Sequence, residues 1–121
     1  MAIMPRELTK SQKKAAHALL DLALDRECAA FISKVSRLVD KPLSDDDKPN
    51  HTRYLELYKA INGFDKHLGK TYDSLSGNML LSKVTSLLME GVLNLKDLDI
   101  CDDQLRGDIL GLLNLYMEMN K

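Results

Sequence analysis

The stretch GNMLLSKVTSLLMEGVLNL, residues 77–95, indicates most plainly which class of fold this chain adopts. Its large apolar residues return every three or four positions, which places them on one face of an α-helix. That face consists of Leu80, Leu81, Val84, Leu87, Leu88, Val92 and Leu95. No segment of the sequence shows a convincing period-two alternation of the kind that marks a half-buried β-strand. The sequence therefore predicts an all-α protein.

Three further segments carry the same helical spacing. Thr9 and Gln12 have the spacing of a capping box, which starts the first helix, and Pro42 is expected to stop it. The predicted helices cover residues 9–40, 50–68, 73–95 and 101–119. Because the connections are short, we expect an antiparallel four-helix bundle, or a five-helix bundle, in one helical domain over residues 1–121.

The first predicted helix is unusually long for a chain of 121 residues. Unbroken, it would extend about 45 Å at 1.5 Å per residue, which exceeds the width of a compact domain of this size. Either the helix kinks near residues 25–27, or one of its ends projects and meets a partner.

The composition limits the classes of partner. A net charge of −1 gives no electrostatic reason to expect binding to nucleic acid or to an anionic membrane. The longest apolar run, ILGLL, is far too short to cross a bilayer. Cys28 and Cys101 are too few for a disulfide framework, so a reduced, cytoplasmic protein is expected.

The sequence contains no motif for nucleophilic catalysis. It has no Gly-x-Ser-x-Gly elbow, phosphate loop or dinucleotide fingerprint, so we expect a non-catalytic protein without a cofactor. The acidic segment NLKDLDICDDQLRGD, residues 94–108, fails the calcium-loop pattern. Counted from Asp97, the fifth position is Cys101, and Asp102 replaces the glycine of the sixth. The segment predicts instead the start of the last helix, with Asp99 as N-cap and Asp102 and Asp103 in the first turn.

Two acids, Glu27 and Asp65, fall among apolar residues of the predicted helices. A buried carboxylate needs a partner, so Glu27 is expected to pair with an arginine or lysine or to lie at a kink. An alternative hypothesis makes both acids part of a carboxylate-dependent metal enzyme, although the Glu-x-x-His motifs of such bundles are missing. The sequence therefore predicts no metal ligand.

A basic cluster stands at the start of the first helix. Lys10, Lys13 and Lys14 lie where free backbone amides already favour anions, so they are candidate contacts to nucleic-acid phosphates. A small helical subunit that binds nucleic acid in this way is the alternative to a protein-binding role.

The last helix is apolar on two sides, which predicts a second contact beyond its core face. The additional face consists of Gly107, Leu110, Gly111 and Leu115. Gly77 and Gly91 lie on the buried face of the preceding helix, where small residues would let another helix approach closely. We therefore expect a non-catalytic helical interaction or adapter module, whose partner is another protein or a second copy of the chain.

Overall fold

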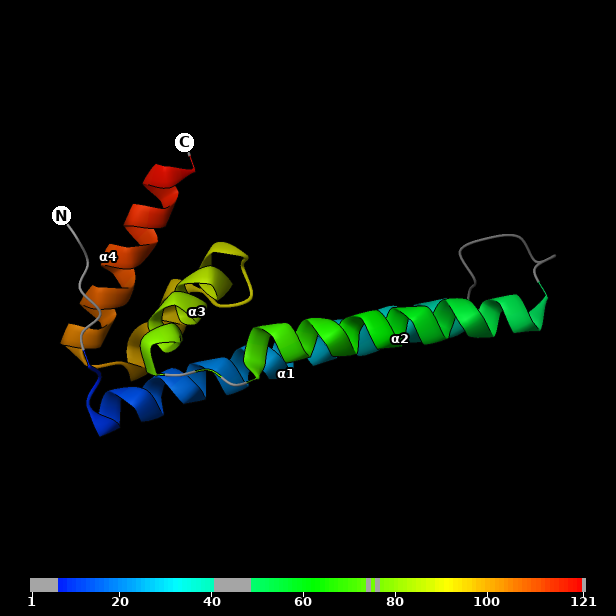
Figure 1. Ribbon diagram of the computed structural model, residues 1–121, viewed down its shortest axis with the longest axis horizontal. Helices are drawn as coiled ribbons and strands as arrows, with labels where there is room; N and C mark the ends of the chain where they lie inside the picture. Colours follow the sequence, from blue (N-terminus) through cyan, green and yellow to red (C-terminus); the bar gives the residue numbers. More distant parts are fainter. Residues whose placement is uncertain (1–6, 41–48, 74, 76, 121) are drawn as a thin grey trace. The chain divides into compact units, whose positions relative to one another are not determined.

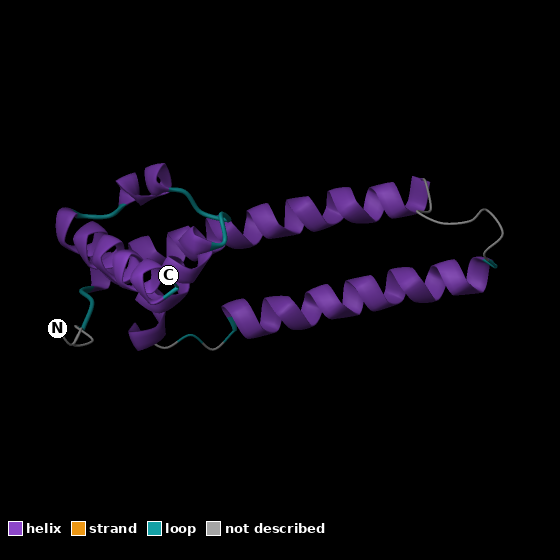
Figure 2. Ribbon diagram, turned by 90° about the horizontal axis from the view of Figure 1, so that it is seen from above, coloured by secondary structure: helices purple, strands orange, loops and turns teal. Residues whose placement is uncertain are grey.

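The computed structural model describes residues 7–40, 49–73, 75 and 77–120, and all regular structure within these ranges is helical (Figures 1 and 2). The elements are α1 (Lys10–Asp40), α2 (Asn50–Tyr72), α3 (Gly77–Met89), the 3₁₀ helix η1 (Leu95–Ile100) and α4 (Asp103–Met119). The predicted all-α helical bundle is thereby confirmed. None of the helices described is both long and apolar enough to cross a membrane.

The chain divides into two compact units. Unit 1 contains Met1–Leu24 and Ser74–Lys121, and unit 2 contains Asp25–Asp73. They subdivide the single domain that the sequence predicted. Helix α1 is continuous from Lys10 to Asp40 and contributes its first half to unit 1 and its second half to unit 2. Of the two alternatives for this long helix, a break at residues 25–27 does not occur.

Unit 1 holds the hydrophobic core. Its buried apolar side chains come from the first half of α1, from α3, η1 and α4, and from the segments beside them. They are Leu8, Ala16, Leu19, Leu20, Ala23, Leu80, Val84, Leu87, Leu93, Leu98, Leu105 and Ile109. Residues 16, 19, 20 and 23 recur at helical spacing, which gives α1 one apolar stripe toward this core.

A buried glutamine joins the starts of α1 and α4. Gln12 N donates to Thr9 Oγ1 at 3.1 Å and Thr9 N donates to Gln12 Oε1 at 3.0 Å, which confirms the predicted capping box. Gln12 is only 2% exposed, and its Nε2 donates to the two carboxylate oxygens of Asp102 at 3.2 and 3.1 Å. Asp102 Oδ1 also accepts from Leu105 N at 2.7 Å, which makes Asp102 the N-cap of α4.

The acidic segment forms a helix of its own before α4. Asn94 and Asp97 make a capping box at the start of η1, with Asp97 N donating to Asn94 Oδ1 at 3.1 Å. The prediction that Asp99 caps the last helix is therefore wrong. Because residues 95–100 form η1, the cap of α4 moves to Asp102, and Asp99 instead accepts from Arg106 Nη1 at 3.4 Å.

Helix α3 is shorter than the predicted 73–95, because Gly91 ends it. Gly91 has a positive φ of 81°, and its N donates to Leu88 O at 3.2 Å while Val92 N donates to Leu87 O at 3.0 Å. These two bonds form a Schellman motif, in which glycine is the residue just past the helix end. Gly91 is thus a terminating glycine and not a site of close helix packing, and Leu95 beyond it is 55% exposed.

The different backbone requirements at Gly91 and Gly111 can be measured. Replacing Gly91 with alanine is expected to lower the free energy of unfolding by about 1–2 kcal/mol, because a Cβ disfavours the left-handed conformation. Replacing Gly111 with alanine is expected to raise it by about 0.5–1 kcal/mol, because Gly111 lies inside α4 and a Cβ there meets no atom within 4 Å. Urea unfolding followed by circular dichroism measures both values, and equal signs would contradict the assignment of Gly91.

Candidate interaction surface

Unit 2 is an antiparallel pair formed by the second half of α1 and by α2 (Figure 2). The rings of Phe31 and Phe64 stack at its centre with 4.1 Å between centroids and 6° between planes. Apolar residues alternate at spacings of three and four along both helices, as in a coiled-coil seam. The seam residues are Cys28, Phe31, Val35 and Leu38 of α1 and Leu57, Ala60, Phe64 and Leu68 of α2, and all are half-buried.

No residue of unit 2 is fully buried within the ranges that the structure describes. The buried residues of α1 all belong to its first half, and α2 has none. Two helices bury only one stripe each against one another, so a pair of this kind lacks the closed core that a third layer would provide.

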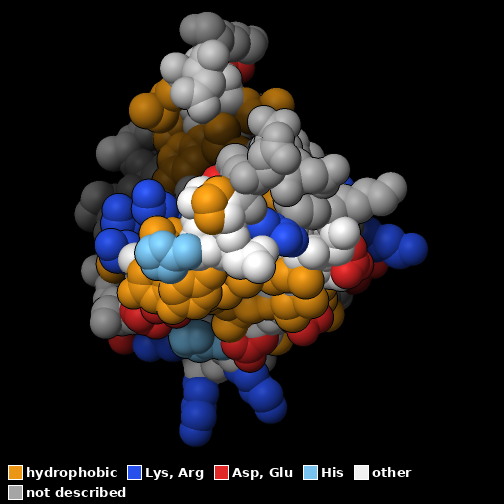
Figure 3. Space-filling model, turned by 90° about the vertical axis from the view of Figure 1, so that its right-hand side faces the viewer, with side chains coloured by type: hydrophobic (Ala, Val, Ile, Leu, Met, Phe, Trp, Pro, Cys, Tyr) orange, Lys and Arg blue, Asp and Glu red, His pale blue; other side chains and the backbone are white. Residues whose placement is uncertain are grey.

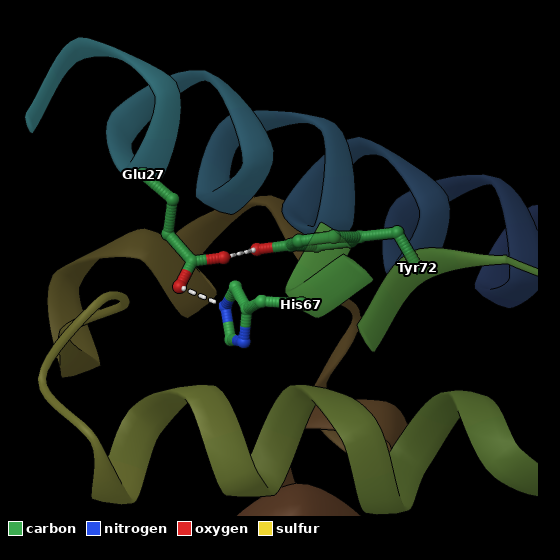
Figure 4. A network of polar contacts seen from close by, with 3 residues as sticks. All are labelled: Glu27, His67 and Tyr72. Carbon is green, nitrogen blue, oxygen red and sulfur yellow. Dashed lines mark hydrogen bonds and ion pairs between the residues drawn. The ribbon is translucent and has the colours of Figure 1, made fainter. Parts of the chain in front are cut away.

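Glu27 is held by two side chains of α2 (Figure 4). Its Oε1 lies 3.0 Å from His67 Nε2, and its Oε2 accepts a hydrogen bond from the Tyr72 hydroxyl at 2.5 Å. The Glu27 side chain is 16% exposed, so it lies half-buried as part of an intact helix. The expected pairing with an arginine or lysine is replaced by one with a histidine and a tyrosine. These bonds tie the last turns of α2 to the middle of α1.

The same contacts explain why α2 is longer than predicted. The helix continues past the predicted end at residue 68 to Tyr72, and Asp73 N beyond it donates to Gly69 O at 3.1 Å. Asp65, the other acid expected to be buried, is exposed, so that prediction is wrong. Position 65 directly follows the seam residue Phe64 and turns away from the α1 side of the helix.

The described residues hold no group of three or more histidine, cysteine or acidic side chains that could bind a metal ion. His17, Asp21 and Asp25, which follow one another along α1, are all exposed. The hypothesis of a metal enzyme built on Glu27 and Asp65 thus gains no supporting geometry.

The surroundings of Cys101 do not favour its reactive form. Cys28 and Cys101 are free thiols that lie half-buried in different units. Burial and the negative charge of Asp102 raise the pKa of the Cys101 thiol, although the positive charge of Arg106 acts in the opposite direction. A raised pKa lowers the thiolate fraction at neutral pH, and the thiolate is the reactive form.

The three lysines of the basic cluster lie in the first turns of α1. Lys10 and Lys14 are exposed, and Lys13 is half-buried. One of the amide groups that would serve an anion, that of Gln12, already donates to the Thr9 hydroxyl. Phosphate binding by these lysines stays a prediction.

The glycine-bearing face of α4 faces solvent. A Cβ added to Gly107 or Gly111 would meet no atom within 4 Å, and Leu110 and Leu115 are 36% and 40% exposed. Of the two contacts expected for this face, with another helix or with a second subunit, close packing by another helix is not found in the described part of the chain. The opposite side of α4 supplies the core contacts, including the hydroxyl of Tyr116, which lies 2.9 Å from Ser82 Oγ of α3. A contact with a second subunit at this face stays a prediction.

A larger set of exposed apolar side chains lies on unit 2. We define it as the apolar hairpin face, and it comprises Ile32, Val39, Tyr54, Tyr58 and Ile61, with exposed fractions of 67, 54, 61, 56 and 47%. Figure 3 looks onto the end of the hairpin and shows hydrophobic side chains open to solvent there. By spacing alone, Tyr54, Tyr58 and Ile61 belong to the same helical stripe as Leu57 and Phe64, so the sequence does not separate the seam from its flank.

These five residues project to one side of the hairpin. Ile32, Tyr54 and Ile61 each lie three residues before a seam residue. In an antiparallel pair, a twofold axis perpendicular to the plane of the two helices relates one helix to the other. Residues with the same offset from a seam residue therefore project to the same side of the pair. Val39 lies seven residues after Ile32, and Tyr58 lies four residues after Tyr54, so both also project to this side of the hairpin.

Comparison of the chain with protein-family models, with curated proteins and with solved structures finds no match.

Proposed function

We propose that this chain is a non-catalytic helical interaction module that binds a protein partner through the apolar hairpin face. The observation that carries the proposal is the exposure of five large apolar side chains on one side of a helix pair that has no buried residue within the described ranges. Isolated exposed hydrophobic residues are ordinary, whereas a contiguous patch marks a binding surface.

The size of this patch supports the proposal. Taking about 200 Å² for a large apolar residue when fully exposed, the five exposed fractions correspond to roughly 600 Å². The largest apolar patch on a typical monomer measures about 300–600 Å² and is often functional. Two of the five residues are tyrosines, which are enriched in interfaces because one end is apolar and the other polar.

Site-specific photocrosslinking in cells tests the proposal. A photoreactive phenylalanine analogue at Tyr54 is expected to give a discrete protein adduct, because Tyr54 belongs to the apolar hairpin face and is 61% exposed. The matched control carries the same analogue at Leu55, which is 40% exposed but points about 100° further around α2.

Mass spectrometry identifies the adduct, and either another protein or a second copy of this chain agrees with the proposed function. The adduct at position 54 is also expected to decrease when Ile61 is replaced by lysine. The same adducts in equal yield at positions 54 and 55, or none at either, would contradict a binding role for this face.

A further inference from the structure

We propose that the occupant of the apolar hairpin face is a second copy of this chain, so that two hairpins pair face to face as a four-helix bundle. This inference rests on the proposed function and names its partner. The first argument is the absence of a fully buried residue in unit 2 within the described ranges, although the rings of Phe31 and Phe64 already stack between its helices. A second helix pair is the layer that would bury the flanks of that seam.

The second argument is area. Two copies that covered their apolar hairpin faces would remove roughly 1,200 Å² from water at these five residues. A specific interface needs about 1,000 Å² in total, and a standard one buries about 1,600 Å². The apolar residues alone therefore meet the minimum, and the polar residues at their edges would supply the remainder.

The third argument is charge. In the described part of the hairpin, basic and acidic residues nearly balance, so a second copy meets no large excess of like charge. They are Arg26, Lys34, Arg37, Arg53, Lys59, Lys66 and Lys70 against Asp25, Glu27, Asp40, Glu56, Asp65 and Asp73. A strongly basic or acidic partner would have little to recognise here, whereas a second copy of the nearly neutral hairpin is not repelled.

Symmetry adds to this argument. Most soluble oligomers are twofold homodimers, in which the same patch serves both subunits. The twofold axis that relates two face-to-face hairpins lies in the plane between them, so each of the five residues is used twice.

Sedimentation equilibrium of the purified full chain tests the inference over about 1–200 μM. We expect a species of twice the 13.6 kDa mass of one chain. Replacing Ile61 with lysine is expected to weaken dimerisation at least about tenfold, because the substitution places two charges in one apolar interface.

The control is Leu55→Lys, which introduces the same charge at an exposed apolar position about 120° around α2 from Ile61. It is expected to leave the dimer unchanged. Circular dichroism shows whether Ile61→Lys keeps its helix content. If Ile61→Lys loses helix content, Tyr58→Gln is used in its place, because Tyr58 is 56% exposed and this substitution is milder.

A monomeric wild-type chain at every concentration would overturn the inference. So would a dimer that Ile61→Lys and Leu55→Lys weaken equally, or one that only Leu115→Lys on α4 disrupts. A monomer together with a crosslink from Tyr54 to a different protein would overturn the second copy as partner while leaving the proposed function intact.

Discussion

Replacing Leu98 with alanine is expected to lower the free energy of unfolding by about 2–5 kcal/mol. Leu98 is fully buried and is the only buried residue of η1. Truncation removes three apolar carbons from the core and leaves a cavity that the surrounding side chains refill only in part. The expected loss is a large fraction of the total stability of a domain of this size.

Leu95→Ala is the matched control for this prediction. Leu95 begins the same 3₁₀ helix but is 55% exposed, so its truncation is expected to change the free energy of unfolding by less than about 0.5 kcal/mol. Urea denaturation of both variants supplies the comparison. Similar losses at the two positions would contradict the assignment of Leu98, and not Leu95, to the core.

Replacing Asp102 with alanine is expected to lower the free energy of unfolding by about 2–4 kcal/mol. Loss of the N-cap bond to Leu105 N costs about 1 kcal/mol. In addition, the amide of Gln12, which is only 2% exposed, loses both carboxylate oxygens to which it donates and keeps the longer contact to Gln104 Oε1 at 3.4 Å. Weakening the hydrogen bonds of a buried donor in this way costs a further 1–3 kcal/mol or so.

Two variants separate these contributions from a general effect of charge. Asp103→Ala removes an exposed acid from the same first turn and is expected to cost only about 0.3–1 kcal/mol through the helix dipole. Asp102→Asn keeps an oxygen that can cap Leu105 and accept from Gln12, so it is expected to retain most of the stability. Losses of equal size for Asp102→Ala and Asp103→Ala would contradict the role of the Gln12 contact.

Local chemistry explains which parts of the fold were predictable. Thr9 and Gln12 form the capping box that their spacing predicted, since both partners lie within one helical turn. The partner of Gln12 at the start of α4 is 90 residues away, and no local pattern indicates it. The stripe position of Glu27 predicted a partner, but His67 and Tyr72 are 40 and 45 residues distant in sequence.

Gly91 shows why helix ends were harder to predict. The apolar spacing of residues 80–95 continues across it, so periodicity alone favours one helix, and the Schellman motif depends on backbone geometry that spacing does not record. The glycines of α4 illustrate the reverse case. Gly107 and Gly111 suggested close packing, yet the structure leaves room for a Cβ at both.

The sequence by itself determined the helical class, the capping box at Thr9 and the approximate course of the helices, because these depend on residues within a few positions of one another. Only the tertiary structure decided which apolar stripe became core. Leu98 and Ile109 are buried whereas Ile32 and Tyr54 are exposed, although all four have other apolar residues at helical spacing beside them in the sequence. Burial depends on which other elements cover a face, and that information lies in contacts between distant segments.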